Sequence, residues 1–287
     1  MNEFDAIRRR YAEEIRIKAN LRSEALVTAF ANVSREHFLG PGPWQIINPA
    51  NRKFPVTEVA DPRHLYQDVL AAIDPARDLN NGQPSYLAFC LDSLDLHPGD
   101  SVLHVGCGLG YYTAIMAEVV GPAGRVMGVE IDPDLASRAS ENLAHLPQVE
   151  VVHTDGGGDD LGPWDAILIN AGATHPRAVW LESLRPGGRL ILFLTAAVDD
   201  SGMGRGGALK VKREGQGYTA RFISSVSVFH CLGCRDEQSN LRLREAMERG
   251  GWRAVRSLRQ ESHEPNETCW LHGDGFCLST LLVPMDH

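Results

Sequence analysis

Three regularly spaced glycines, Gly106, Gly108 and Gly110, follow a strand-like apolar run and precede a segment with helical character. Glycine has no Cβ, so such a loop lets the backbone approach a ligand closely, and the start of the next helix adds free N–H groups. The following apolar run, 125–130, ends in Glu130, about twenty positions beyond the loop, where a carboxylate can accept both hydroxyls of a ribose. Together these residues predict a site for a cofactor that contains adenosine.

The spacing of the glycines separates two classes of cofactor. A dinucleotide-binding loop has the pattern Gly-x-Gly-x-x-Gly, but here the third glycine comes one position early and Tyr111 stands where that pattern has glycine. A P-loop would need a lysine that this loop lacks. The Gly-x-Gly-x-Gly spacing resembles motif I of S-adenosylmethionine-dependent methyltransferases with a Rossmann-like fold. A tight strand-to-helix turn without a ligand is the competing interpretation, and the surrounding segments favour the cofactor.

The elements that must position this loop alternate between strands and helices. We predict helices over 111–120 and 133–144, the second capped by Asp132, and strands over 125–130, 149–153, 165–170 and 190–194. The alternation predicts an α/β fold with a Rossmann-like, doubly wound, mostly parallel sheet. Ligands of such sheets bind at the carboxyl ends of the strands, where Glu130, Asp155 and Asn170 fall. We also predict a break over 184–188 and an antiparallel C-terminal hairpin formed by 209–212 and 221–229.

The chain of 287 residues is long enough to bury a full hydrophobic core, and we divide it into three regions. Residues 1–100 form a helical N-terminal region with loops on the substrate side, 101–234 form the Rossmann-like cofactor domain, and 235–287 form a small C-terminal addition. The apolar stripe along 3–31 is a core face or the contact surface of a homodimer.

Charge and hydropathy argue against two classes of partner. The formal net charge is −9 and no basic stripe is visible, so nucleic acid is not expected to bind. The sequence contains no apolar run of eighteen residues, and its N-terminus is charged, unlike a signal peptide. We therefore expect a cytoplasmic protein without a membrane partner.

Several short motifs resemble those of the protein-L-isoaspartate O-methyltransferase family. The similar stretches are 33–38 (VSREHF against V-x-R-E-x-F), 65–68 (LYQD against A-Y-x-D), 82–84 (GQP against S-Q-P), 110–114, 155–156 and 186–190. The resemblance extends over about residues 25–230. It implies that a methyl group passes from S-adenosylmethionine to a carboxylate of a protein or peptide, with S-adenosylhomocysteine as the product. The C-terminal addition marks the chain as a divergent member.

The resemblance and the strand ends together suggest which residues contact the cofactor. The candidate cofactor-binding residues are Gln83, His104, Gly106, Gly108, Gly110, Glu130, Ile131, Asp155, Gly156 and Asn170. Glu130 is expected to accept from the ribose hydroxyls, Asp155 to accept from the adenine amino group, and Asn170 to lie near the methionine end. His104 stands where the family usually has an acid; we interpret it as a buried, hydrogen-bonded histidine, with pH-dependent tuning of cofactor binding as the alternative.

The substrate side calls for groups that position a carboxylate. A carboxylate is already ionised near pH 7, so its methylation needs orientation and partial desolvation more than a general base. The candidate catalytic groups are the amides of Asn80 and Asn81 and the hydroxyl of Ser85, which can hold carboxylate oxygens without neutralising them. A plain turn over 80–82 is the competing interpretation.

The acceptor itself stays open between two classes of molecule. The family usually has Thr-Ile-Ser where this chain has Asn80, Asn81 and Gly82. This departure and the C-terminal addition favour a small-molecule or natural-product methyltransferase that has lost isoaspartyl repair, whereas the matching 65–68 and 82–84 motifs favour a protein or peptide carboxylate. A protein that binds the cofactor without turnover, and a dehydrogenase, are weaker alternatives.

Six cysteines in a chain of this length do not indicate a disulfide-stabilised scaffold. Cys231-x-x-Cys234 and Cys269-x-x-His272 together have the number and spacing of zinc ligands. Their apolar neighbours favour ordinary core cysteines, so we expect no metal, and metal analysis of the purified protein tests that expectation. The C-terminal stretch, with His263 and His272, would otherwise form part of a substrate pocket.

Overall fold

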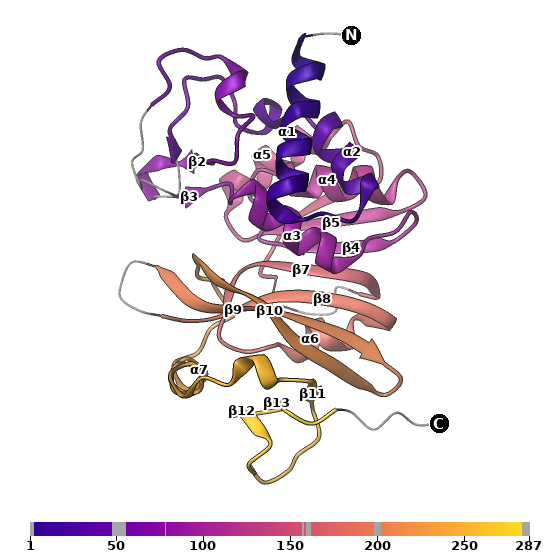
Figure 1. Cartoon of the computed structure of the whole chain (residues 1–287), viewed down its shortest axis with the longest axis vertical. Coiled ribbons are helices and arrows are strands. Elements are labelled where there is room, and N and C mark those ends of the chain that lie inside the picture. The colour runs from indigo at the N-terminus through magenta and orange to yellow at the C-terminus, as the bar shows by residue number, and fades with distance from the viewer. Residues whose placement is uncertain are drawn as a thin grey trace. The chain divides into compact units, whose positions relative to one another are not determined.

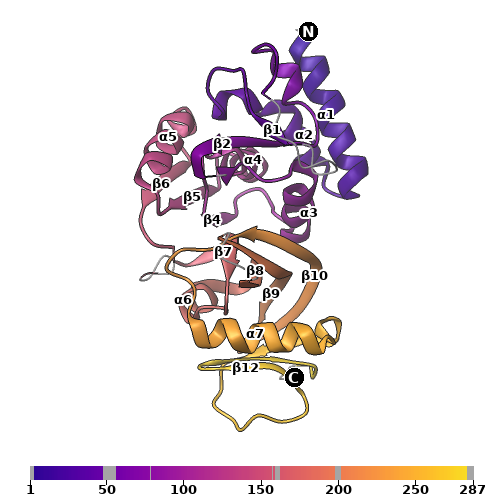
Figure 2. The same ribbon diagram turned by 90° about the vertical axis from the view of Figure 1, so that its left-hand side faces the viewer.

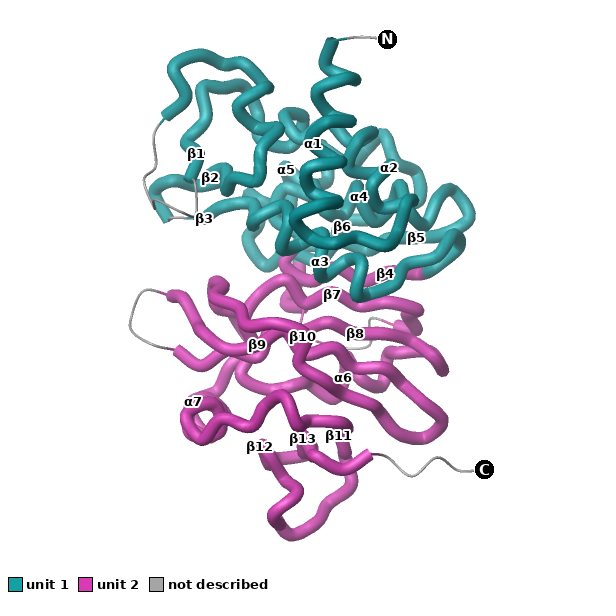
Figure 3. Tube along the Cα trace, viewed as in Figure 1, with its two compact units in different colours: residues 1–100, 107–153 teal, residues 101–106, 154–287 magenta. Residues whose placement is uncertain are grey.

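The computed structural model describes residues 3–47, 56–77, 79–156, 158, 162–197 and 202–282. Contacts divide the chain into two compact units, the first of residues 1–100 and 107–153 and the second of residues 101–106 and 154–287 (Figure 3). The chain passes from the second unit to the first inside the glycine loop, between Gly106 and Cys107. The functional boundaries at 100 and 234 stay a prediction.

Two helices, α1 (Glu3–Ala19) and α2 (Glu24–Asn32), pack side by side at the start of the first unit (Figure 1). The predicted apolar stripe contributes to the core of this unit, because Tyr11, Ile15 and Phe30 are each at most 1% exposed. The core interpretation of the stripe is therefore confirmed for these residues.

The rest of the first unit contains the helices and strands around the glycine loop. The short strands β1 (Ile46–Ile47), β2 (Leu70–Asp74) and β3 (Leu79–Asn80) form an antiparallel sheet in that order. They are followed by α3 (Pro84–Leu94), α4 (Tyr111–Val120), β5 (Arg125–Glu130), α5 (Pro133–Leu143) and β6 (Val149–His153). Strands β5 and β6 pair in parallel, and the Asp132 carboxylate accepts from Asp134 N and Leu135 N, both at 3.0 Å, which confirms the predicted cap.

The second unit is built on a mixed sheet with the strand order β12-β13-β11-β10-β9-β8-β7-β4. Its strands are β4 (Ser101–Val105), β7 (Trp164–Ala173), β8 (Leu184–Ala197), β9 (Met203–Glu214), β10 (Gly217–Phe229), β11 (Ser257–Arg259), β12 (Cys269–Gly273) and β13 (Phe276–Ser279). Strands β4, β7 and β8 pair in parallel. The remaining pairs, β8–β9, β9–β10, β10–β11, β11–β13 and β13–β12, are antiparallel. The predicted α/β class and the antiparallel hairpin are confirmed.

Helices complete the two units. In the second unit, α6 (Ala178–Glu182) packs on β8, and α7 (Glu237–Arg249) packs against β8 and β12 (Figure 2). Single 3-10 turns are η1 (Arg35–Phe38), η2 (Pro62–His64), η3 (Pro75–Arg77) and η4 (Trp252–Ala254). Among the described residues, no helix is both long and apolar enough to cross a bilayer.

Some details differ from the prediction. The break expected over 184–188 lies inside β8 as an interruption of its pairing with β7: Trp164 pairs with Leu184 and Ala166 with Arg189, so the register skips 185–188. Asn170 lies inside β7 and not at its end, since the strand continues beyond a register shift between Ile169 and Gly172. The C-terminal addition extends the sheet of the second unit, with β11 pairing along β10.

Candidate cofactor and substrate sites

The Glu130 carboxylate ends β5 and is held there by backbone N–H groups. Gly108 N donates to Oε2 at 2.8 Å, while Ile131 N and Asp132 N donate to Oε1 at 3.0 and 3.2 Å. Each carboxylate oxygen has about two lone-pair sites, so Oε2 keeps one acceptor position after Gly108 has donated. The first unit thus brings Gly108, Glu130 and Ile131 together and orients the carboxylate through the backbone.

The loop glycines adopt conformations that other residues rarely reach. Gly106, Gly108 and Gly110 have φ values of +76°, +56° and +92°. A Cβ on Gly110 would lie 2.6 Å from Leu143 Cδ1, so a larger residue would also collide with α5. The left-handed backbone therefore favours glycine at all three positions, and at Gly110 the close packing requires it as well.

Asp155 and Gly156 lie in the second unit, where both are closely packed. A Cβ on Gly156 would lie 2.1 Å from Val105 Cγ1, and the Gly156 carbonyl accepts from Trp180 Nε1 at 2.7 Å. A Cβ on Gly233 would lie 2.5 Å from Asp155 Oδ2. The turn that contains Gly233 therefore packs directly against the acid predicted to bind adenine.

Asn170 and His104 also belong to the second unit. Asn170 Nδ2 donates to Gly106 O at 3.5 Å, so Asn170 contacts the first glycine of the loop. His104 in β4 is 0% exposed, and burial lowers its pKa to about 3. The histidine therefore stays neutral at physiological pH, which favours the buried-histidine interpretation over pH-dependent tuning of cofactor binding.

The predicted substrate residues form a second group in the first unit. Asn80 Oδ1 accepts from Gly82 N at 3.0 Å, which makes the turn that was the competing interpretation. Asn81 Oδ1 accepts from Ala71 N at 3.0 Å, whereas its Nδ2 is buried without a hydrogen-bond partner. The amide of Asn81 thus has a fixed oxygen and an unused pair of donor hydrogens.

The Ser85 hydroxyl already has an acceptor for its proton. It donates to Asp68 Oδ2 at 2.7 Å, and Ser85 N donates to Asp68 Oδ1 at 2.8 Å. Gln83 Nε2 also donates to Asp68 Oδ2, at 3.0 Å. A hydroxyl has one proton, so Ser85 cannot donate to a substrate carboxylate while it donates to Asp68. This geometry favours a role for Ser85 and Gln83 in positioning the start of α3.

Comparisons with known proteins agree with the motifs. The family model described as protein-L-isoaspartate(D-aspartate) O-methyltransferase matches residues 9–201, more than half of the chain. The chain belongs to this family. A protein-L-isoaspartate O-methyltransferase of Hyperthermus butylicus is 31% identical over 202 residues, which cover 66% of this chain and 75% of that protein. Protein-L-isoaspartate O-methyltransferase 2 of Archaeoglobus fulgidus is 37% identical over 143 residues, 46% of this chain and 65% of that protein.

The first curated relatives are matched over less than two thirds of their length, 55% for the Aeropyrum pernix methyltransferase. Two solved structures share the fold. One, titled protein-L-isoaspartate O-methyltransferase, has a TM-score of 0.62 and 23% identity and covers 84% of this chain and 69% of its own. The other is a Plasmodium falciparum β-aspartate methyltransferase in complex with S-adenosyl-L-homocysteine. It has a TM-score of 0.59 and 18% identity, and the match covers 78% of this chain and 97% of that structure's chain.

The family motifs converge on Arg35, a residue that the sequence analysis did not include among the site residues. Its buried guanidinium donates to the carbonyls of Leu65, Gln67 and Val69 at 2.6, 3.1 and 2.6 Å. It also donates to Asn81 Oδ1 at 3.2 Å. The signal was present in the 33–38 and 65–68 motifs, but the sequence does not show that an arginine from one motif closes the loop formed by the other.

Proposed function

We propose that this chain is an S-adenosylmethionine-dependent O-methyltransferase that acts on a carboxylate of a protein or peptide. The observation that carries the proposal is the Glu130 carboxylate, fixed by three backbone N–H groups beside the glycine loop. A carboxylate held in this way, with one acceptor position left, suits a hydroxyl of a ribose. Membership in the family supports the same conclusion.

The proposal assigns cofactor contacts to several residues of the chain. We propose that Glu130 and the loop glycines hold the ribose and methionine portions, that Asp155 and Gly156 hold adenine, and that Asn170 lies near the methionine end. Bound S-adenosylmethionine supplies a methyl group on a cationic sulfur, which an ionised carboxylate attacks without a general base. The role left to the protein is to orient and partly desolvate that carboxylate.

Asn81 is the best candidate on the substrate side. Its oxygen accepts from Ala71 N and from Arg35 Nη2, so the amide plane cannot rotate freely. Its buried Nδ2 has hydrogens to donate and no partner to receive them. We propose that Nδ2 donates to one oxygen of the substrate carboxylate, which leaves the nucleophilic charge in place because an amide is neutral.

The function is tested by transfer of labelled methyl from S-adenosylmethionine to paired peptides that differ only in isoaspartate against aspartate. We expect base-labile label on the isoaspartyl peptide and about tenfold less or none on its aspartyl partner, since discrimination by one displaced group is worth 1–3 kcal/mol. Label on neither peptide, with measurable binding of S-adenosylhomocysteine, would contradict the peptide acceptor but not the cofactor. No binding of S-adenosylhomocysteine would contradict the whole proposal.

Asn81→Asp provides a sharper test of the substrate side. Aspartate keeps the acceptor oxygens for Ala71 N and Arg35, but it removes the amide donor and adds a charge that repels a carboxylate substrate. We expect kcat/KM to fall at least tenfold, about 1.4 kcal/mol, with little change in Tm. The exposed Asn20→Asp is the matched control in the same unit. Unchanged kcat and KM would remove Asn81 from the site and leave 80–82 as a plain turn.

The small-molecule acceptor remains the second candidate function. It is favoured by Gly82, which provides no hydroxyl where the family usually has serine, and by the C-terminal strands that join the sheet of the second unit.

We also propose a cytoplasmic location, because all six cysteines are free, as expected in a reducing compartment. The homodimer stays a prediction, supported only by exposed apolar residues such as Ile17, 68% exposed in α1.

A further inference from the structure

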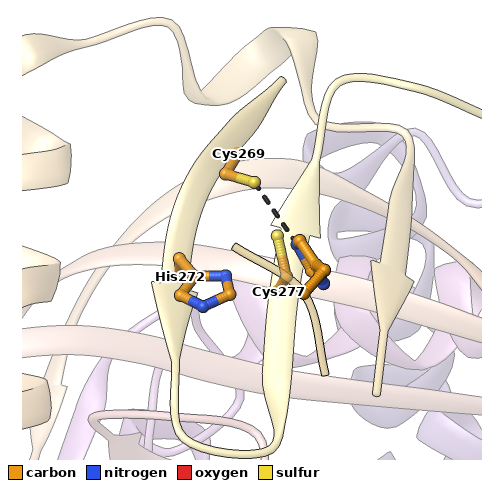
Figure 4. Close-up of side chains that lie close together, drawn as sticks. Cys269, His272 and Cys277 are labelled. Carbon is orange, nitrogen blue, oxygen red and sulfur yellow. Dashed lines mark hydrogen bonds between the residues drawn. The ribbon is translucent and has the colours of Figure 1, made fainter. Parts of the chain in front are cut away.

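Four metal-binding side chains gather at the C-terminal end of the second unit. Each of His263, Cys269, His272 and Cys277 offers one ligand atom, and these atoms all lie within 4.8 Å of one another. Figure 4 shows Cys269 and His272 on one strand and Cys277 on the next, with their side chains converging. Two thiols and two imidazoles are a ligand set typical of structural zinc sites.

The β12–β13 hairpin explains how these side chains reach one face. Residues three apart on a regular strand point to opposite faces, so Cys269 and His272 would normally face apart. The pairing of β12 with β13 shifts register between Cys269 and Leu271, and this bulge restores both residues to the same face. Cys277 lies directly opposite His272 in the ladder. A bulge that gathers ligands is a specific feature of this hairpin, because an even strand would separate them.

His263 is oriented as a metal ligand would be. Its Nδ1 lies 2.9 Å from the carbonyl of Glu261, which only a protonated Nδ1 can satisfy. That hydrogen bond leaves Nε2 with its lone pair, and Nε2 lies 3.5 Å from Cys269 Sγ. A histidine ligand held by a backbone carbonyl through its other nitrogen is the arrangement usual around zinc.

The guanidinium of Arg259 is the alternative to a metal ion as the cation that contacts this cluster. It cannot donate a hydrogen bond to every ligand atom of the cluster. Its Nη2 lies 2.8 Å from His263 Nε2 and 3.6 Å from both Cys269 Sγ and Cys277 Sγ. A guanidinium Nη carries two hydrogens, so it cannot serve three acceptors at once. In addition, His272 Nδ1 is buried and has no hydrogen-bond partner. The cluster therefore has more ligand atoms than the arginine can use.

We propose that His263, Cys269, His272 and Cys277 bind one Zn²⁺ that fastens the C-terminal hairpin to the 259–266 segment. Zn–S and Zn–N bonds of about 2.3 and 2.0 Å place tetrahedral ligand atoms roughly 3.3–3.8 Å apart, so the cluster contracts by about 1 Å on binding. Four protein ligands fill the coordination sphere, which makes the site structural. Binding replaces the two thiol protons, and two thiolates balance the charge of the ion.

The proposed ligands differ from the four residues with zinc-like spacing in the sequence, and the proposal takes the place of the expectation that no metal binds. Cys269 and His272 take part, but Cys231 and Cys234 do not: Cys234 Sγ lies 4.0 Å from Asp155 Oδ1, and neither cysteine belongs to the cluster. The two additional ligands are His263, before β12, and Cys277, on β13. The inference does not depend on the proposed methyl transfer.

The test is elemental analysis of the full chain, purified with reductant and without chelator. We expect about one equivalent of zinc in the native chain, about one in the control Cys234→Ser, and less than a tenth in Cys269→Ser and Cys277→Ser. Zinc that is retained in Cys269→Ser and Cys277→Ser would be an adventitious ion and would overturn the site.

A second measurement protects the test against variants that fail to fold. Chelator-treated native chain is titrated with Co²⁺, whose visible absorption becomes intense in a tetrahedral site with thiolate ligands. A saturable signal at about one equivalent, displaced by Zn²⁺, supports the site even if the protein was purified without metal. Less than a tenth of an equivalent of zinc together with no Co²⁺ signal would overturn it.

Discussion

Replacing Arg35 by methionine is expected to lower the free energy of unfolding by about 3–5 kcal/mol. The side chain is 0% exposed and donates to three main-chain carbonyls and to Asn81. Methionine fills much of the same space but donates nothing, so the carbonyls of Leu65 and Val69, whose bonds to Arg35 are buried, lose this partner without gaining water. Equilibrium urea unfolding of the native chain and the variant measures the difference.

Arg63→Met is the matched control for this prediction. Arg63 is also in the first unit, but its side chain is 60% exposed and pairs with Asp61 at the surface. Such a pair contributes about 0–1 kcal/mol. Arg35→Lys should fall between the two, because one ammonium cannot reproduce the planar fork that reaches several carbonyls. If Arg35→Met lowered the free energy of unfolding by no more than Arg63→Met, the 65–69 loop would have to be held by other contacts.

The central elements of the fold could be predicted from local sequence. Strand β5 and helix α4 have the predicted bounds, since glycine interrupts the backbone pattern before α4 and Glu130 ends an apolar run. The cap of α5 was predictable for the same reason, because Asp132 bonds to N–H groups only two and three residues away. Local hydrogen bonding leaves a pattern in the sequence that can be interpreted directly.

The remaining features depend on contacts between distant residues. Arg35 bonds to a loop thirty residues later, and nothing near it in the sequence shows which carbonyls it will reach. The ligands of the proposed zinc site depend on a bulge in β12, and without it Cys269 and His272 would face apart. Spacing alone therefore groups Cys231 and Cys234 with Cys269 and His272, and their apolar neighbours led to the expectation of no metal. In the structure Cys234 lies beside Asp155, about eighty residues earlier in the chain.

Replacing Glu130 by alanine is expected to weaken binding of S-adenosylhomocysteine by about 100-fold. A hydrogen bond from a ribose hydroxyl to the one acceptor position left on this charged carboxylate contributes about 1.5–3 kcal/mol, and a 100-fold change corresponds to about 2.7 kcal/mol. Alanine also leaves Gly108 N, Ile131 N and Asp132 N without the acceptor that shapes the loop. Isothermal titration calorimetry with S-adenosylhomocysteine measures the affinity directly.

Two further variants separate the ribose contacts from the support of the loop. Glu130→Gln keeps one acceptor oxygen for the loop N–H groups but loses the charge, so its affinity should lie between those of the native chain and Glu130→Ala. Glu141→Ala removes an exposed acid from α5 in the same unit and should bind like the native chain. If Glu130→Ala bound as tightly as Glu141→Ala, Glu130 would serve only to hold its own backbone. The ribose would then need another acceptor, and the assignment of β5 to the cofactor site would be wrong.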